Sequence, residues 1–148
     1  MKSFKYAMQK SYEYMKKEID EITTGSIYSE AEMEKVFYAC GTCLHWILDF
    51  AERVKVPNAD PKYISAFRFA NNTLKHDSNL FEFTEQTGGF SFPMSFPLEI
   101  ENKEIRWKTL NNNGGYESQH ENYKEYLEGK IVVDTCKEII ELLLNYEN

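Results

Sequence analysis

The chain has 148 residues and a mass of 17.4 kDa, which fits one domain around one core. Hydrophobic residues make up 42% of it and aromatic residues 15%, which excludes an intrinsically disordered chain. No apolar run approaches the roughly 18 residues of a membrane helix, and the N-terminus lacks the apolar stretch of a secretory signal. We therefore expect a cytoplasmic protein that makes no contact with a membrane.

The net charge is −7, from 17 basic and 24 acidic residues, which argues against broad electrostatic capture of nucleic acid. Its distribution is uneven. Residues 61–80 carry three basic side chains and one acidic side chain, whereas residues 81–148 carry six basic and thirteen acidic side chains. One small basic island therefore lies within an acidic chain.

The N-terminal half predicts helices. From about 3 to 23, apolar residues recur at steps of three and four, the spacing of an amphipathic helix that ends before Gly25. Ser29, followed by acidic residues, is typical of an N-cap, and the helix that it begins stops before Pro57. Asp60-Pro61 repeats the start signal for a third helix, which we expect to run to about His76.

Beyond Asp77 the period changes to two, which predicts strands. The alternating apolar residues are Phe81, Phe83, Phe90, Phe92, Leu98, Ile100, Ile105 and Trp107. We expect turns at Gly88-Gly89 and Asn102-Lys103. The helical period returns from Tyr116, as one long helix or as two helices end to end, with a break at Gly129.

These elements predict a mainly α fold. We expect a four- to five-helix bundle with a small antiparallel β-meander, at about 80–110, inserted between helices three and four. The bundle would form the core and the meander a flap on its side. The aromatic strands would pack on the helices or, as an alternative, form a platform for stacking bases.

Three cysteines in a chain without a signal predict free thiols. Cys40-Gly41-Thr42-Cys43, with His45 nearby, has a spacing that serves redox or zinc sites. This segment lies within a predicted helix among apolar residues, and a zinc site would need a second pair of ligands, for which only Cys136 and His120 remain. We therefore expect these small residues to permit close helix packing, with His45 partly buried.

The third helix carries a polar stripe. At about 100° per residue, one face collects Arg68, Asn72, Lys75 and His76. The opposite face collects Ile64, Phe67, Ala70 and Leu74, which would anchor the helix in the bundle. A histidine exchanges protons near neutral pH, and Arg68 and Lys75 would stabilise an anion such as a phosphate. Asn72 would orient the imidazole or hold a ribose hydroxyl.

This stripe suits phosphate-ester chemistry or nucleotide binding without a metal. A purely structural alternative exists for the same residues. Lys75 and His76 would then cap the C-terminus of the helix, where its dipole favours cations, and Arg68 would pair with a Glu of a neighbouring helix.

A helical bundle with this motif resembles the HEPN superfamily, whose helical domains carry an Arg-polar-x-x-x-His motif. Aligning His76 with the family histidine places Asn72 on the polar position. Asn71 then stands where the family usually has arginine, and Arg68 lies one turn earlier on the same stripe. The resemblance covers the helical frame and about nine residues of motif, and it leaves the β insertion unexplained.

The resemblance implies a homodimer whose two motif helices face each other and bind or cut RNA, in a toxin or defence system. We expect His76 to act as the acid or base, and Arg68 and Asn72 to complete the catalytic set, Arg68 as a phosphate contact and Asn72 as the orienting residue. Lys75 and Asn71 would also contact phosphate. No metal or other cofactor is needed. The alternative function is a non-enzymatic interaction module that dimerises or binds a protein partner through its helices, with a degenerate site.

Overall fold

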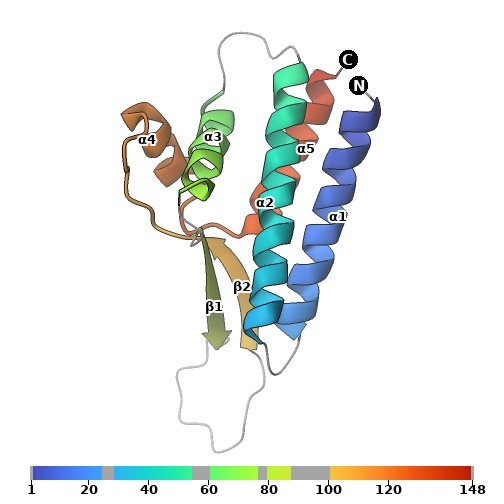
Figure 1. The fold of residues 1–148 in the computed structure, drawn as a ribbon, viewed down its shortest axis with the longest axis vertical. Helices are drawn as coiled ribbons and strands as arrows, with labels where there is room; N and C mark the ends of the chain where they lie inside the picture. Colours follow the sequence, from blue (N-terminus) through green and yellow to red (C-terminus); the bar gives the residue numbers. More distant parts are fainter. Residues whose placement is uncertain (1, 25–28, 55–60, 77–79, 88–100, 148) are drawn as a thin grey trace, which may run out of the picture.

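The structure is a computed structural model that describes residues 2–24, 29–54, 61–76, 80–87 and 101–147. It is mainly helical, with two strands between the third and fourth helices (Figure 1). The elements are α1 (Lys2–Thr24), α2 (Glu30–Arg53), α3 (Lys62–Leu74), β1 (Phe81–Thr87), β2 (Glu101–Trp107), α4 (Glu117–Tyr126) and α5 (Val132–Tyr146). Among the described helices, none combines the length and the apolar character that crossing a bilayer requires.

Helices α1 and α2 form an antiparallel pair that α5 completes as a third member (Figure 1). The apolar stripe of α1, which includes Met8, Met15 and Ile19, is buried in this packing. The predicted N-cap of α2 is confirmed: the Ser29 hydroxyl accepts a hydrogen bond from the Glu32 amide, and the Glu32 carboxylate accepts one from the Ser29 amide. This capping box satisfies two amides that a helix start leaves unpaired.

Helices α3 and α4 pack against each other beside the first three (Figure 1). The amides of Ile64 and Ser65 bond to the Pro61 carbonyl, so α3 begins at Lys62, and its last residue is Leu74. The helix is therefore shorter at its C-terminal end than the sequence predicted. The predicted capping residue Asp60 lies outside the described residues.

The two strands pair antiparallel, with Phe81 opposite Trp107 and Phe83 opposite Ile105. The predicted turn at Asn102-Lys103 is wrong, because both residues lie within β2, opposite Gln86 and Glu85. The period-two pattern was correct for these two strands, but it did not show that its first segment pairs with its last. The turn at Gly88-Gly89 and the strands expected around Phe90 and Leu98 lie outside the described residues.

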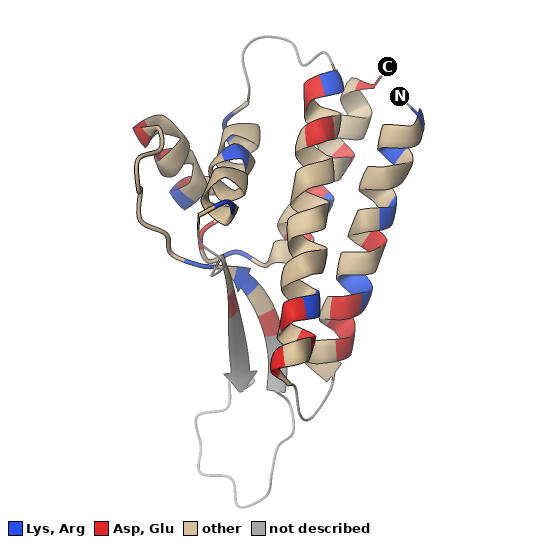
Figure 2. Cartoon of the chain, in the orientation of Figure 1, with Lys and Arg blue, Asp and Glu red and all other residues tan. Residues whose placement is uncertain are grey.

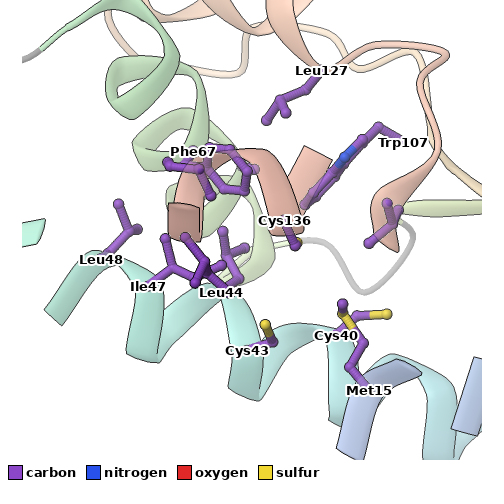
Figure 3. Close-up of a cluster of buried hydrophobic side chains, with 14 of the residues drawn as sticks. Met15, Cys40, Cys43, Leu44, Ile47, Leu48, Phe67, Trp107, Leu127 and Cys136 are labelled. Atoms are coloured by element: carbon purple, nitrogen blue, oxygen red, sulfur yellow. The ribbon is translucent and has the colours of Figure 1, made fainter. Parts of the chain in front are cut away.

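Contrary to the sequence prediction, the pair of strands β1 and β2 is not a flap on the side of the bundle. Ile105 and Trp107 are both 1% exposed and belong to the same core as the helices. The Trp107 indole N–H donates to the Thr135 hydroxyl at 2.8 Å, which satisfies the polar atom that burial takes from water. Figure 3 shows Trp107 and Phe67 beside the cysteines of α2 and α5. Strand β2 is therefore a structural part of the core.

The chain after Tyr116 forms two helices, and they do not lie end to end. Gly129 has a φ of 77°, which glycine adopts without strain, and it lies in the turn between α4 and α5. Helix α4 packs on α3, whereas α5 returns to α1 and α2. The turn is tied to β2 by backbone hydrogen bonds from Gly129 to Trp107 and from Trp107 to Lys130. These hydrogen bonds to β2 fix the turn at which the chain changes direction between α4 and α5.

Candidate functional site

The polar stripe of α3 faces away from the core. Ile64, Phe67 and Ala70 are buried, whereas the side chains of Asn72, Lys75 and His76 are exposed and that of Asn71 is half-buried. The helical spacing of the sequence therefore separated the two faces correctly except at Leu74, which is half-buried and lines a surface depression. The buried face fixes the helix, so that the exposed residues occupy defined positions on its surface.

Arg68 has a partner on the neighbouring helix. Its guanidinium Nη1 lies 3.3 Å from Oε1 of Glu52 on α2, and the Arg68 side chain is 25% exposed. The structural alternative for Arg68 anticipated such a pair. A half-exposed arginine held beside a carboxylate presents less positive charge to a phosphate than a lone arginine does.

Lys75 and His76 follow the last residue of α3. The His76 amide donates to the Thr73 carbonyl at 3.0 Å, so one hydrogen-bonded turn follows the helix. Both side chains extend from the negative end of the helix dipole, a position that favours cations. The location fits both the capping role and an exposed acid or base.

A shallow depression adjoins this end of α3. It has a volume of about 300 Å³ and is lined by Phe37, Tyr38, Gly41, Thr42 and His45 of α2 and by Leu74 of α3. The helices approach closely here, since a Cβ on Gly41 would lie 3.2 Å from Leu74 Cδ2. Two aromatic side chains therefore lie near the residues that precede His76. No sequence pattern links these two aromatic residues with the stripe, because they belong to a different helix.

Helix α3 also differs from the other described elements in charge. It contains Lys62 and Arg68 and no carboxylate, whereas each of the other six contains at least one Asp or Glu. Figure 2 shows acidic side chains gathered instead where α1 ends and α2 begins. Helix α3 itself therefore contributes no carboxylate that would repel an anion.

The three cysteines are free, as predicted, and all three are buried. Burial raises the pKa of Cys40 above that of an ordinary thiol, and a hydrogen bond with Cys43 together with burial raises the pKa of Cys136. Such thiols stay protonated and unreactive at neutral pH. The packing role expected for the C-x-x-C segment agrees with the contact between Gly41 and Leu74.

The expectation for His45 was wrong. Its side chain is 62% exposed, and Nε2 lies 3.6 Å from Asp49 one turn along α2. It lies on the outer face of α2, where it lines the depression. Within the described part of the chain, no three His, Cys, Asp or Glu side chains are grouped as ligands for a metal.

The aromatic residues of the strands do not form an exposed platform where they are described. Trp107 is buried, and the Phe81 ring packs 5.3 Å from it and 6.2 Å from the Phe37 ring. These contacts use the aromatic faces within the protein. The Phe83 side chain, Phe90 and Phe92 lie outside what the structure describes.

His120 has a structural environment. Its Nε2 lies 2.8 Å from the Leu110 carbonyl oxygen, and its ring stacks on Phe69 at 4.9 Å. It is 7% exposed. These contacts hold α4 against α3, so His120 contributes to packing.

Comparison with known proteins gave no relative: the chain matches no family model, no curated protein and no solved structure. The site therefore has to be interpreted from its own residues.

Proposed function

We propose that the protein is a HEPN-like RNA-directed protein, a metal-independent ribonuclease or RNA-binding factor of a toxin or defence system, with its site at the C-terminal end of α3. The observation that carries the proposal is the group of Arg68 and Asn72 on α3, a helix without carboxylates, with Lys75 and His76 in the turn that directly follows it. A proton-transfer group, cations and an amide on one surface are what RNA phosphate chemistry requires.

The depression beside the stripe supplies a place for a base. Phe37 and Tyr38 contribute aromatic side chains, and Tyr38 is 64% exposed. Stacking on an aromatic ring is tolerant of base identity. Because the depression reaches Leu74, a nucleotide lying there would carry its phosphate toward Lys75 and His76.

The proposed reaction is an internal transesterification that cuts the RNA backbone. The ribose 2′-oxygen loses its proton to a base and forms a bond to the adjacent phosphorus. The bond from phosphorus to the 5′-oxygen breaks, and the leaving oxygen takes a proton from an acid. The products are a 2′,3′-cyclic phosphate and a free 5′-hydroxyl.

His76 would supply one of these two proton transfers, and the second copy in a homodimer would supply the other. Lys75 and Arg68 would stabilise the negative charge of the crowded phosphorane. Asn72, one helical turn before His76, would hold the ribose hydroxyl or the imidazole. Asn71, half-buried at the position of the family arginine, would contribute a neutral contact to phosphate.

The test is cleavage of end-labelled single-stranded RNA in EDTA by the wild type, by His76→Ala and by Lys10→Ala. Lys10 is a control because it is an exposed cation on α1 that does not line the depression. We expect cleavage by the wild type and by Lys10→Ala, and a loss of at least about 100-fold in His76→Ala, the lower end for general acid–base catalysis. Equal rates in all three proteins would overturn the catalytic assignment.

A second function is favoured by the ion pair between Arg68 and Glu52, which engages the main cation of the stripe within the protein. The chain would then be an interaction module that dimerises or binds another protein. Exposed aromatic side chains such as Tyr38 and Tyr116 suit such an interface. Absence of RNA cleavage and RNA binding, together with a concentration-dependent dimer in light scattering, would support this function.

A further inference from the structure

A separate cavity lies between α3 and α5, under the turn that leads from α4. It has a volume of about 230 Å³. Its floor includes Phe67, Leu127 and Ile139, all buried in the core. Phe67 and Leu127 both appear in Figure 3, from α3 and from the turn after α4. The cavity uses the face of α3 that bears Tyr63 and Phe67, and the polar stripe takes no part in it.

The walls of this cavity suit a flat apolar group. Tyr63 and Tyr126 contribute aromatic rings from different helices, and Leu142, which is 40% exposed, contributes an aliphatic edge. A cavity of about 150 Å³ accepts benzene. The larger volume here accommodates a phenyl-sized ring with a short substituent.

The cavity has charges of both signs among its lining residues. The Lys130 ammonium donates to the Glu125 carbonyl at 3.2 Å and lies 5.9 Å from the centre of the Tyr126 ring. An ammonium has three N–H donors, so further donors remain. Glu138 is exposed, and its carboxylate has no ion pair with any residue that the structure describes. A ligand could therefore pair with one cation and one anion.

Long-range hydrogen bonds fix the position of these groups. The Trp107 amide donates to the Lys130 carbonyl at 3.0 Å, and the Arg106 guanidinium donates to the Gly129 carbonyl at 2.7 Å. The Tyr63 hydroxyl lies 3.3 Å from the Tyr146 hydroxyl, which holds the ring of one wall. A pocket that is ordered before binding loses less entropy when a ligand enters.

We propose that this cavity binds a small aromatic zwitterion, of the aromatic amino-acid class. The ring lies between Tyr63 and Tyr126 on the Phe67 floor. The ligand carboxylate pairs with Lys130, and the ligand ammonium pairs with Glu138. This site is independent of the proposed action on RNA.

The test is titration of the full chain with L-phenylalanine, followed by amide chemical shifts in NMR. We expect saturable shifts of residues around Lys130 and Glu138. Phenylpropionate lacks the ammonium and phenethylamine lacks the carboxylate, so each should bind about tenfold more weakly, the effect of losing one charged hydrogen bond. L-Alanine, which lacks the ring, should cause no saturable shift.

Two pairs of variants test the charges. Lys130→Met and Glu138→Gln should each weaken L-phenylalanine binding about tenfold. Lys137→Met and Glu141→Gln change the same charges on exposed residues of α5 that do not line the cavity, and they should leave binding unchanged. Leu142→Trp would fill the cavity and abolish binding, while its circular dichroism spectrum stays that of the wild type.

Three results would overturn the proposal: no saturable shift up to the solubility limit of L-phenylalanine, equal affinity for the two truncated probes and the amino acid, or the same loss in Glu141→Gln as in Glu138→Gln. None of these results bears on RNA cleavage. The failure of one proposal is therefore distinguishable from the failure of the other.

Discussion

The two faces of α3 have opposite surroundings although they share one backbone. One face places Ile64, Phe67 and Ala70 at 0–1% exposure in the core. The other face presents Asn72, and the turn that follows presents Lys75 and His76, to solvent. Stability and surface chemistry are therefore separable on this helix, because the side chains that anchor it are different from those that face a partner.

The buried face should be the most sensitive to substitution. Phe67→Ala removes a ring that packs 5.8 Å from Trp107, and we expect it to lower the free energy of unfolding by about 3–5 kcal/mol. Urea denaturation followed by Trp fluorescence measures this change. A loss below about 1 kcal/mol would mean that Phe67 does not anchor the helix.

The core against which this face packs should also make the fold sensitive to alkali. Burial raises the pKa of Cys40 and of Tyr123, and the pKa of Tyr63 is raised to about 12. The folded state therefore holds these protons more tightly than the unfolded chain does. The stability that these groups contribute should be constant below about pH 9, the ordinary thiol value, and should fall above it, by at most about 1.4 kcal/mol per pH unit for each group.

The measurement is the free energy of unfolding at neutral pH and at pH values above that of an ordinary thiol, for the wild type and for Cys40→Ala. The alanine variant starts less stable but should lose less on raising the pH. Identical slopes in the two proteins would contradict a contribution from the Cys40 thiol.

Substitutions at the contact between α2 and α3 should have smaller effects on stability, and these effects should depend on the size of the new side chain. A methyl group at Gly41 would press on the flexible end of Leu74 at 3.2 Å, and alanine also favours the helix, so Gly41→Ala should change stability by less than about 1 kcal/mol. Gly41→Leu should cost about 1–3 kcal/mol through overpacking. Thermal unfolding of both variants checks this order. Equal melting temperatures would contradict close packing of Gly41 against Leu74.

The exposed face should be almost silent in stability. Asn72→Ala and His76→Ala remove side chains that reach solvent, so each should change the free energy of unfolding by less than about 0.5 kcal/mol. The same urea titration as for Phe67→Ala measures both. A larger loss in either variant would give that side chain a structural role.

The helices could be predicted from the sequence because their apolar spacing, the Ser29 cap and Gly129 are local signals. The strand pairing could not be predicted. Phe81 pairs with Trp107 across a long connection, and the alternation of side chains is the same whichever strands are neighbours. The separation of α4 from α5 also depends on long-range bonds to β2, which leave no local pattern.

The candidate site also combines local features, which the sequence predicts, with features that depend on the tertiary fold. Arg68 and Asn72 share one face of α3 because of the helical period, whereas Lys75 and His76 lie in the turn after the helix. Its partner Glu52 and the aromatic depression on α2 depend on how two helices cross. The cavity between α3 and α5 could not be foreseen either, since Tyr63, Lys130 and Glu138 are distant in the chain and have no shared spacing.

The most direct test of whether stability and surface chemistry are separable is to measure both properties in two variants. One variant changes the buried face of α3, and the other changes the turn that follows this helix. Phe67→Leu and His76→Ala are each assayed for unfolding free energy in urea and for RNA cleavage in EDTA at a temperature where both are folded. The account predicts that Phe67→Leu loses stability and keeps cleavage, whereas His76→Ala keeps stability and loses cleavage. Loss of both properties together in His76→Ala, or wild-type cleavage by that variant, would contradict it.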